Sequence, residues 1–567
     1  MKIEKSKTEI IKEESRGLRG SILQELVSGE SGVSADTATL LKFHGIYQYD
    51  DRDLRRTLLR EGKAKDHRFV VRTKTPGGAL SAEQWLILDE AADRYGNSTL
   101  RLTSRQDVQL HGVGKPDLKS LVQLLNTRLI STFGACGDGV RNVVACPVSA
   151  VAKGSDLDAP SWAARISQAL TFSSTAYLEI WLDRDQSDPQ LEEPLFGPAY
   201  LPRKFKIAMA SEHDNCADVY TNDVGIVPVI QKRRLAGFDI LAGGGLGSSH
   251  GNKDSYPRLA EPLCRVNPEQ LIPTLRALVA AYRDLGDRSD RKHARLKYVI
   301  EEQGIEQFRS RVEKLLGRAL AAPGAVSLSP RVSHLGWQPQ RQEGLNCLGL
   351  FIESGRIHDQ GAAQLKSGLR AAVTQFRPRI ALTPDENIVL LDIPDRSCAD
   401  LENLLNAFRI PLSETISPLR QNTIACPALP TCGLALTEAE RLLPRLMSDL
   451  EALGCGSESV SIRISGCPNS CSRAPVAEIG VVGRSGNGYH LYLGGSPRGD
   501  RLARLFRENV PAEHLPVLIA RLIGGWRGAR APGESFGDWW CRVGAAESTL
   551  LKSSPADPVG FTGPVRP

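Results

Sequence analysis

Four cysteines in the last third of the chain are spaced in a way that suggests one shared ligand. They form the patterns C-x5-C and C-x3-C, in the segments ACPALPTC and GCPNSC. Four thiolates supply the softness and negative charge that an iron–sulfur cluster requires. Prolines in both segments restrict the backbone and help to fix the directions of the thiolates. The four residues are Cys426, Cys432, Cys467 and Cys471.

Two other interpretations of these cysteines remain open from spacing alone. Structural zinc is one, although zinc-binding cysteines are usually separated by two to four residues, which C-x5-C does not match. The other is four unrelated buried thiols, because a reduced cysteine usually serves as a small buried apolar side chain. The chain has twelve cysteines, and the remaining ones are scattered and fit that second role.

Basic residues in and around predicted strands of the first half form a second group. Apolar neighbours indicate strands that are at least half buried, and a buried cation requires an anionic partner. Arginines suit carboxylates and lysines suit small oxyanions, so the group predicts an anion site. The alternative is that these cations protect the edges of sheets. The group comprises Arg72, Arg101, Arg105, Arg141, Arg203, Lys204 and Lys206.

The elements that would position these groups occur twice along the chain. A strand near residue 69, an amphipathic helix over residues 81–96 and a hairpin around the turn SRQD recur over residues 348–393. The segment TSRQDVQLHGV aligns without gaps with TPDENIVLLDI, and downstream RNVVACP matches NTIACP while VGIVPV matches IGVVGR. Three pairs in the same order predict an internal duplication, with α+β architecture, mixed sheets and a pseudo-twofold relation. Chance recurrence explains them poorly.

Composition limits the class of protein. The 567 residues are 41% hydrophobic and 24% charged, which is typical of soluble globular chains. A net charge of +6 is too small to indicate a nucleic-acid binder. The polar N-terminus does not resemble a signal peptide, and no apolar run is long enough for a membrane helix. We therefore expect a cytoplasmic protein that binds neither nucleic acid nor membrane.

Sequence motifs for nucleotide cofactors are missing. The glycine run LAGGGLGSSHGN does not fit G-x-G-x-x-G, and the chain has no Walker A motif. A redox enzyme built on this chain would therefore receive its electrons from a partner.

These motifs together resemble a known family. The segments FHGIYQYDDRDLR, LRLTSRQDVQLHG, RNVVACP, YLPRKFK, ACPALPTCGLALTEAER and CPNSCSRA are similar, in the same order, to landmarks of the sulfite and nitrite reductases that carry sirohaem and a 4Fe–4S cluster. The likeness covers nearly the whole chain and is strongest to the haemoprotein (beta) subunits of assimilatory sulfite reductases. It implies an enzyme that reduces sulfite to sulfide with six electrons, in assimilatory sulfur metabolism.

The resemblance also implies roles for individual residues. The four cysteines would ligate the 4Fe–4S cluster, and Cys471 would also bridge to the sirohaem iron. Sulfite would be bound by Arg72, Arg141, Lys204 and Lys206. The sirohaem would be held by Arg101, Arg105, Gln109 and Arg203 through its carboxylates, with Asn469 near the bridging loop.

Alternatives at the level of function concern the donor and the substrate. The resemblance favours an NADPH-oxidising flavoprotein subunit with FAD and FMN as the electron donor, with a ferredoxin-fed sulfite or nitrite reductase as the alternative. A non-redox alternative is a structural zinc protein whose basic strands bind a polyanion. One absorption spectrum separates the two classes.

The repeats also predict domain boundaries. We expect residues 1–66 to form an N-terminal arm rather than part of the core, and residues 546–567, rich in proline, glycine and serine, to form a flexible tail. The duplicated ferredoxin-like half-domains would be 67–133 and 345–410, forming one unit. Residues 134–330 would form the first sirohaem and substrate domain, and residues 411–545 the second sirohaem and 4Fe–4S domain.

Overall fold

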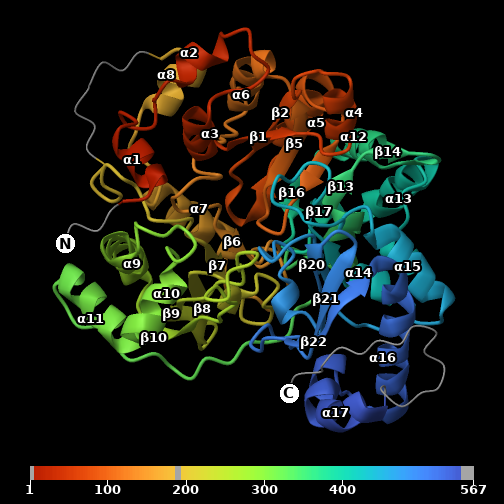
Figure 1. The fold of residues 1–567 in the computed structure, drawn as a ribbon. Coiled ribbons are helices and arrows are strands. Elements are labelled where there is room, and N and C mark those ends of the chain that lie inside the picture. Colours follow the sequence, from red (N-terminus) through yellow and green to blue (C-terminus); the bar gives the residue numbers. More distant parts are fainter. Residues whose placement is uncertain (1–4, 185–192, 551–567) are drawn as a thin grey trace. The chain divides into compact units, whose positions relative to one another are not determined.

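The computed structural model describes residues 5–184 and 193–550, and side chains as far as residue 544. The chain divides into two compact units. The first comprises residues 1–245 and 260–413, and the second comprises residues 246–259 and 414–567. Both units combine helices with mixed or antiparallel sheets (Figure 1).

Two antiparallel sheets in the first unit exchange their edge strands. The first sheet has the order β1 (Ile46–Asp50), β2 (His67–Arg72), β5 (Val108–Val113), β4 (Leu100–Leu102) and β13 (Arg356–Ile357). The second has the order β11 (Gly336–Pro339), β12 (Leu345–Leu350), β17 (Ile388–Pro394), β16 (Arg379–Leu382) and β3 (Ala79–Leu80). Strand β13 of the second repeat therefore completes the first sheet, and β3 of the first repeat completes the second.

Two further sheets share one pattern of strand directions. In the first unit the order is β10 (Glu261–Val266), β9 (Arg234–Ala242), β8 (Val224–Gln231), β7 (Ile207–Met209) and β6 (Val144–Ala145). In the second it is β18 (Thr423–Ala425), β19 (Ile462–Ser465), β20 (Ile479–Ser485), β21 (Gly488–Leu493) and β22 (Arg504–Pro511). Each sheet has two parallel pairings followed by two antiparallel ones along the chain. The predicted duplication and α+β class are confirmed.

Helix α5 (Ala82–Tyr95) begins with a capping box and packs its apolar side chains into the core. Ser81 accepts a hydrogen bond from the Gln84 backbone N–H, and the Gln84 side chain accepts one from the Ser81 backbone N–H. This capping box satisfies two amides that the first turn leaves without helical partners. Trp85, Leu88 and Ala92 are buried in the core. Helix α5 also packs against α6 (Leu118–Asn126) and against α12 (Leu365–Phe376), the corresponding helix of the second repeat.

The helices that follow α6 along the chain, apart from α12, are divided between the two units. Those of the first unit are α7 (Ala159–Ala169), α8 (Ala176–Leu182), α9 (Leu271–Leu285), α10 (Leu296–Gln303), α11 (Ile305–Leu316) and α13 (Cys398–Ala407). Those of the second are α14 (Pro418–Gln421), α15 (Leu443–Ala452), α16 (Leu515–Ala529) and α17 (Phe536–Leu550). Helix α17 extends five residues into the segment expected to be a flexible tail, and the rest of that segment lies outside the described residues.

The expectation for residues 1–66 was wrong in one respect, because this segment contributes to the core. It contains α1 (Lys7–Glu13), α2 (Ile22–Leu26), α3 (Ala35–Leu41) and α4 (Arg55–Arg60). Leu18, Ile22 and Phe43 are almost fully buried, and β1 pairs with β2 along its whole length. The helices of this segment are short and separated by charged residues. The sequence therefore shows no helical periodicity that would indicate the burial of these apolar residues.

His44 lies in this core and predicts a specific pH dependence of stability. Its Nδ1 accepts from Trp181 Nε1 (3.0 Å) and its Nε2 donates to the Leu18 carbonyl (3.1 Å), so the ring is neutral. Burial lowers the pKa of His44 from 6.5 to about 4. The unfolded chain therefore binds the proton more readily, and a penalty that is absent above pH 6.5 grows as the pH falls towards 4, to about 3 kcal/mol.

This penalty can be measured by chemical denaturation between pH 7 and pH 4. We expect a His44→Gln variant to lose less stability over that interval than the parent chain does. His490, whose pKa burial also lowers to about 4, serves as the comparison position. Parallel pH profiles for the parent and His44→Gln would contradict the prediction.

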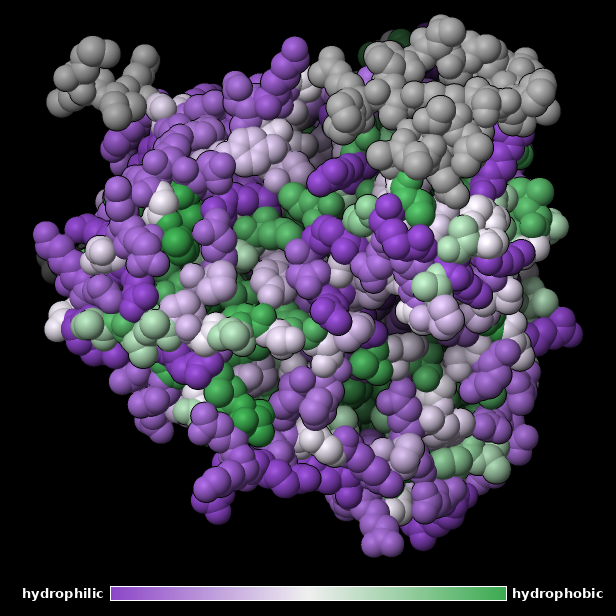
Figure 2. All heavy atoms as spheres, turned by 90° about the horizontal axis from the view of Figure 1, so that it is seen from below, coloured by the Kyte–Doolittle hydropathy of each residue, from purple (hydrophilic) through white to green (hydrophobic). Residues whose placement is uncertain are grey.

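The hydrophilic character of the surface agrees with the composition expected of a globular chain. Hydrophilic side chains predominate on the face in Figure 2, and apolar ones lie among them in small groups. In the part of the chain that the structure describes, none of the helices has the length and hydropathy required to cross a membrane.

Candidate functional site

Three of the predicted site residues lie on neighbouring strands of the first sheet. Arg72 on β2 is the cross-strand partner of Gln109 on β5, and Gln109 is the partner of Arg101 on β4. Residues paired in this way project from the same face of a sheet. With its amide oxygen directed at the guanidinium, Gln109 accepts a hydrogen bond from Arg72 Nε at 2.9 Å. The register therefore brings these three side chains together.

Arginines from three segments converge on the buried carboxylate of Asp107. Burial raises the pKa of Asp107, and the nearby Arg72, Arg105 and Arg141 partly offset that rise. Arg72 Nε lies 3.5 Å from Asp107 Oδ1. Local positive charge therefore exceeds the one buried carboxylate, which is the electrostatic condition for binding a further anion.

Tyr47 and Cys136 lie in the same surroundings. Burial raises the pKa of Tyr47 to about 12 and also raises that of Cys136, while Arg72 and Arg141 act on both groups in the opposite direction. Sequence reasoning did not select these two residues or Asp107. A tyrosine in a strand, a lone cysteine and an acidic residue in a polar turn give no separate signal.

The segment YLPRKFK is mostly irregular, with a strand only from Ile207. Phe205 forms a single parallel bridge with Val140, and its carbonyl accepts from the Arg141 backbone N–H at 2.9 Å. Arg141 therefore lies beside the segment that carries Lys204 and Lys206, both half-buried. All three residues precede the parallel strands β6 and β7, so they gather at the amino ends of that pair.

Asp223 fixes the backbone at Lys206. Its Oδ2 accepts from the Lys206 backbone N–H (2.8 Å), and both of its oxygens accept from Arg295 (3.0 and 2.8 Å). Arg295 is a further basic residue that sequence reasoning missed, because it lies almost a hundred residues downstream of this segment.

Two other predicted residues make polar contacts within the unit, Arg203 through an ion pair and Arg105 through hydrogen bonds. The Arg203 guanidinium lies 3.6 Å from Asp138, which also receives Arg291 at 2.7 Å. Burial lowers the pKa of Arg203. Although burial alone would raise the pKa of Asp138, Lys12 and Arg291 keep it far below its usual range. Arg105 donates to the carbonyls of Asn142 (3.0 Å) and Ile207 (3.3 Å), which links the hairpin turn to β6 and β7.

Arg101 is fully buried and pairs with Glu386 of the second repeat at 3.0 Å. Its guanidinium also donates to the Leu102 carbonyl at 2.7 Å. The pair joins the hairpin turn of one repeat to the strand β4 of the other. These contacts support a structural role for Arg101, and its contact with a sirohaem carboxylate stays a prediction.

The structural role of Arg101 is testable. We expect Glu386→Ala to lower the free energy of unfolding by about 3 kcal/mol or more, because it leaves a buried guanidinium without this carboxylate. The double variant Arg101→Met/Glu386→Ala should recover part of the loss in chemical denaturation. Equal stability of the single variant and the parent would show that the pair contributes nothing to folding.

The predicted cysteine ligands lie in the second unit, at one edge of its sheet. Cys426 directly follows β18 and Cys467 follows β19 by one residue, and these strands are parallel, so their carboxyl ends meet. Cys426 and Cys467 are buried, Cys432 is half-buried and Cys471 is exposed. Burial raises the pKa of Cys426 well above its ordinary value, and the other three thiols raise it further. Cys426 therefore lies within electrostatic reach of the other three thiols.

Backbone and side-chain donors are directed at these sulfurs. Gly466 N–H donates to Cys426 Sγ (3.3 Å), and Asn469 Nδ2 donates to Cys467 Sγ (3.6 Å). A Cβ at Gly466 would lie 2.6 Å from Ala428 Cβ, so only glycine permits the two cysteine loops to approach this closely. Ser248, in the glycine run, donates its N–H to the Pro468 carbonyl (3.0 Å) and so supports the second loop.

Comparison with known proteins identifies two family models. Residues 60–128 match the nitrite/sulfite reductase ferredoxin-like half domain, and residues 136–320 match the nitrite and sulphite reductase 4Fe-4S domain. The second match covers the first copy of the duplicated sheet, whereas the C-x5-C and C-x3-C patterns lie in the second copy.

Curated relatives match nearly full length. The NADPH sulfite reductase hemoprotein beta-component of Myxococcus xanthus is 39% identical over 97% of this chain and 99% of its own. The same component from Acidithiobacillus ferrooxidans is 40% identical over 94% of this chain and 95% of its own. Among solved structures, the Mycobacterium tuberculosis NirA protein matches with a TM-score of 0.76 and 26% identity, over 95% of both chains.

Proposed function

Because the chain belongs to the nitrite and sulfite reductase family, among the NADPH sulfite reductase hemoprotein beta-components, we propose that it reduces sulfite to sulfide. The enzyme is an oxidoreductase that works with sirohaem and a 4Fe–4S cluster. Near full-length identity to those beta-components carries the proposal. Hydrogen sulfite takes up six electrons and six protons and leaves as hydrosulfide and three waters, so the site must bind an anion and supply protons repeatedly.

The chain's own cations would bind and protonate the substrate. Arg72 and Arg141 would neutralise sulfite, and their convergence on Asp107 supports this assignment. Lys204 and Lys206 would hold its oxygens and donate protons as each S–O bond breaks, because a fixed ammonium stabilises the leaving oxygen. Asp223 would hold the Lys206 backbone in place during turnover.

The four cysteines fit a polynuclear cluster better than a single zinc ion. In tetrahedral zinc sites, neighbouring thiolate sulfurs are about 3.8 Å apart. Among the described residues, no three of these four sulfurs lie within 4.8 Å of one another, although their thiols affect each other's pKa. We propose that Cys426, Cys432, Cys467 and Cys471 hold the 4Fe–4S cluster, and that Cys471, the exposed one, also ligates the sirohaem iron. When bound there, the two groups would supply the electrons of the reduction one at a time.

Polar side chains of the first unit suit the many carboxylates of sirohaem. Arg105 and Arg203 are half-buried, and Gln109 lies beside Arg72 on the same face of the sheet. We assign these three to the cofactor's carboxylates, with Asn469 close to the bridging cysteine. Their hydrogen bonds to the surrounding backbone would keep them oriented, which lowers the entropic cost of binding.

Electrons would come from an NADPH-oxidising flavoprotein subunit with FAD and FMN. The names of the curated relatives support this donor over a ferredoxin. The sequence has no nucleotide-binding motif of its own, which agrees with an external source.

One set of measurements tests the proposal. The purified chain should show the Soret and red-shifted bands of an iron isobacteriochlorin and contain iron and acid-labile sulfide. Together with the flavoprotein subunit and NADPH it should convert sulfite to sulfide, with a larger kcat/KM for sulfite than for nitrite. Turnover with ferredoxin alone would overturn the donor, and preference for nitrite would overturn the substrate. Colourless protein without iron would overturn the function.

A further inference from the structure

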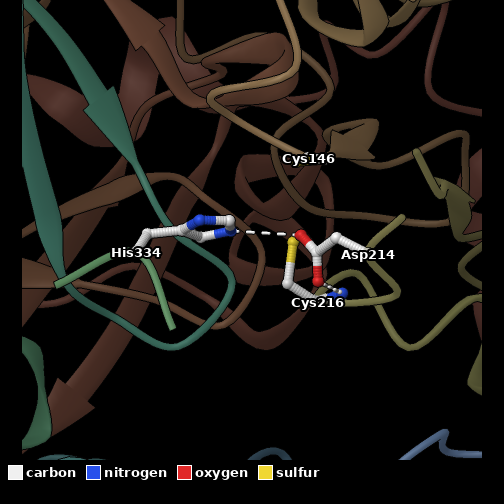
Figure 3. Close-up of side chains that lie close together, drawn as sticks. All are labelled: Cys146, Asp214, Cys216 and His334. Carbon is white, nitrogen blue, oxygen red and sulfur yellow. Dashed lines mark hydrogen bonds and ion pairs between the residues drawn. The ribbon is translucent and has the colours of Figure 1, made fainter. Parts of the chain in front are cut away.

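A second cluster of ligand-type side chains lies in the first unit, apart from the cations assigned to substrate. Cys146 directly follows β6, while Asp214 and Cys216 lie in the loop after β7. His334 lies in the segment just before β11. Because β6 and β7 are parallel, this cluster is at their carboxyl ends, whereas Arg141, Lys204 and Lys206 precede the same strands. Figure 3 shows the imidazole of His334 directed at Asp214, with Cys216 beside them.

The geometry of the cluster suits one small cation. One nitrogen, one oxygen and two sulfurs all lie within 4.8 Å of one another. His334 Nε2 and Asp214 Oδ2 are 3.1 Å apart. Ligands around tetrahedral zinc, with bonds of about 2.0–2.3 Å, lie about 3.3–3.8 Å apart, so only small side-chain movements would complete the coordination.

The carboxylate is already oriented for this purpose. Asp214 Oδ1 accepts from the backbone N–H groups of Cys216 (2.8 Å) and Val332 (3.0 Å). This leaves Oδ2 directed into the cluster, where it forms an ion pair with His334 Nε2 (Figure 3). A divalent cation would take the place of the proton between these two atoms, because a carboxylate and an imidazole are both zinc ligands.

Burial and charge favour a closed site. The four side chains are between 0% and 7% exposed. Arg331 contributes positive charge nearby and pairs with Asp385 at 2.9 Å. Two thiolates and a carboxylate with one divalent cation leave a single net negative charge, and Arg331 and Asp385 beside them form a neutral pair. Sulfur ligands select zinc over magnesium or calcium, and four protein ligands indicate a structural rather than a catalytic ion.

We propose that Cys146, Asp214, Cys216 and His334 bind one structural zinc ion. The ion connects the loops after β6 and β7 to the segment that enters β11. It therefore joins the sheet of β6 to β10 to the second repeat. It holds the carboxyl ends of β6 and β7, whereas the basic residues assigned to sulfite lie at the amino ends of these strands. Its presence does not depend on the sulfite chemistry.

Metal analysis of the full-length holoenzyme, produced with ample iron and zinc, tests the site. We expect about one zinc per chain in addition to complete iron and acid-labile sulfide. Zinc K-edge absorption should show two sulfurs at about 2.3 Å and two nitrogen or oxygen ligands at about 2.0–2.1 Å. Cys216→Ser should lower the zinc content at least tenfold while the haem spectrum is retained. Cys264→Ser, at a buried cysteine of β10 outside the cluster, should keep its zinc.

Several results would overturn the site. These are iron-replete wild-type protein with less than a tenth of a zinc per chain, zinc with four sulfur ligands, or a disulfide between Cys146 and Cys216 in the protein as isolated. If Cys216→Ser does not fold, the ligand set seen by absorption in the wild-type protein still decides the question. A protein with this zinc site but without sirohaem would contradict only the proposed function. An active reductase without zinc would contradict only the site.

Discussion

A Cys432→Ser variant is expected to lose its acid-labile sulfide and most of its iron, and to reduce sulfite at least about 100-fold more slowly. Even partners that only support a metal ligand are worth about 10- to 100-fold in affinity or activity, so loss of a ligand should cost at least as much. Cys432 is half-buried, so exchanging sulfur for oxygen disturbs packing less here than at Cys426. The measurements are iron, sulfide and the rate of NADPH-dependent sulfide formation.

Cys455→Ser provides the matched control. Cys455 is a buried cysteine of the same unit, and burial raises the pKa of its thiol, as expected of an inert side chain. This variant should keep iron, sulfide and activity. If Cys432→Ser also kept them, the assignment of the cluster to these four cysteines would be wrong.

A Lys204→Met variant is expected to bind sirohaem normally and to lose about 100- to 1000-fold in kcat/KM for sulfite. Removing one preorganised charge at a reacting oxygen has an effect of that size. Methionine keeps the length and apolar character of the lysine stem, so packing of the half-buried side chain is preserved. Steady-state kinetics and the absorption spectrum together separate catalysis from cofactor binding.

Lys314→Met is the control for the loss of one positive charge. Lys314 is exposed on α11, and its replacement should leave kcat/KM unchanged. A Lys204→Met enzyme with parental kinetics would exclude this lysine from the substrate site. Loss of sirohaem in that variant would instead indicate a role in holding the cofactor.

The sequence allowed the main repeats of the fold to be predicted, but not the way they exchange strands. VQLHGV alternates between apolar and polar residues and NIVLLDI contains a continuous apolar run, and β5 and β17 formed as expected. Strands β3 and β13 have only two residues each, which is too short for any periodicity to indicate. Their positions depend on pairing between residues that are 255 positions apart for Arg101 and Arg356 and 302 positions apart for Ala79 and Ala381.

The candidate site shows the same division. Spacing indicated the four cysteines, because loops after adjacent parallel strands bring close pairs together. Charge alone did not distinguish Arg72 from Arg101. The Arg72 side chain is partly exposed, whereas Arg101 is buried against Glu386, 285 residues away in the sequence. The ligand set of Cys146 and His334 was likewise not visible, since its members come from three separate segments.

The exchanged edge strands have a consequence for how such a chain could have originated. A polypeptide containing one repeat would have an incomplete sheet and a protruding strand, and two copies could complete each other as a domain-swapped homodimer. Joining the two copies in one chain makes that mutual completion intramolecular and independent of concentration. It also releases the copies from identity, so one could keep arginines where the other has Ala381 and Asp385, and only one needed the cysteines. In this sense the asymmetric chemistry of the protein depends on the reciprocal pairing of β3 with β16 and of β13 with β4.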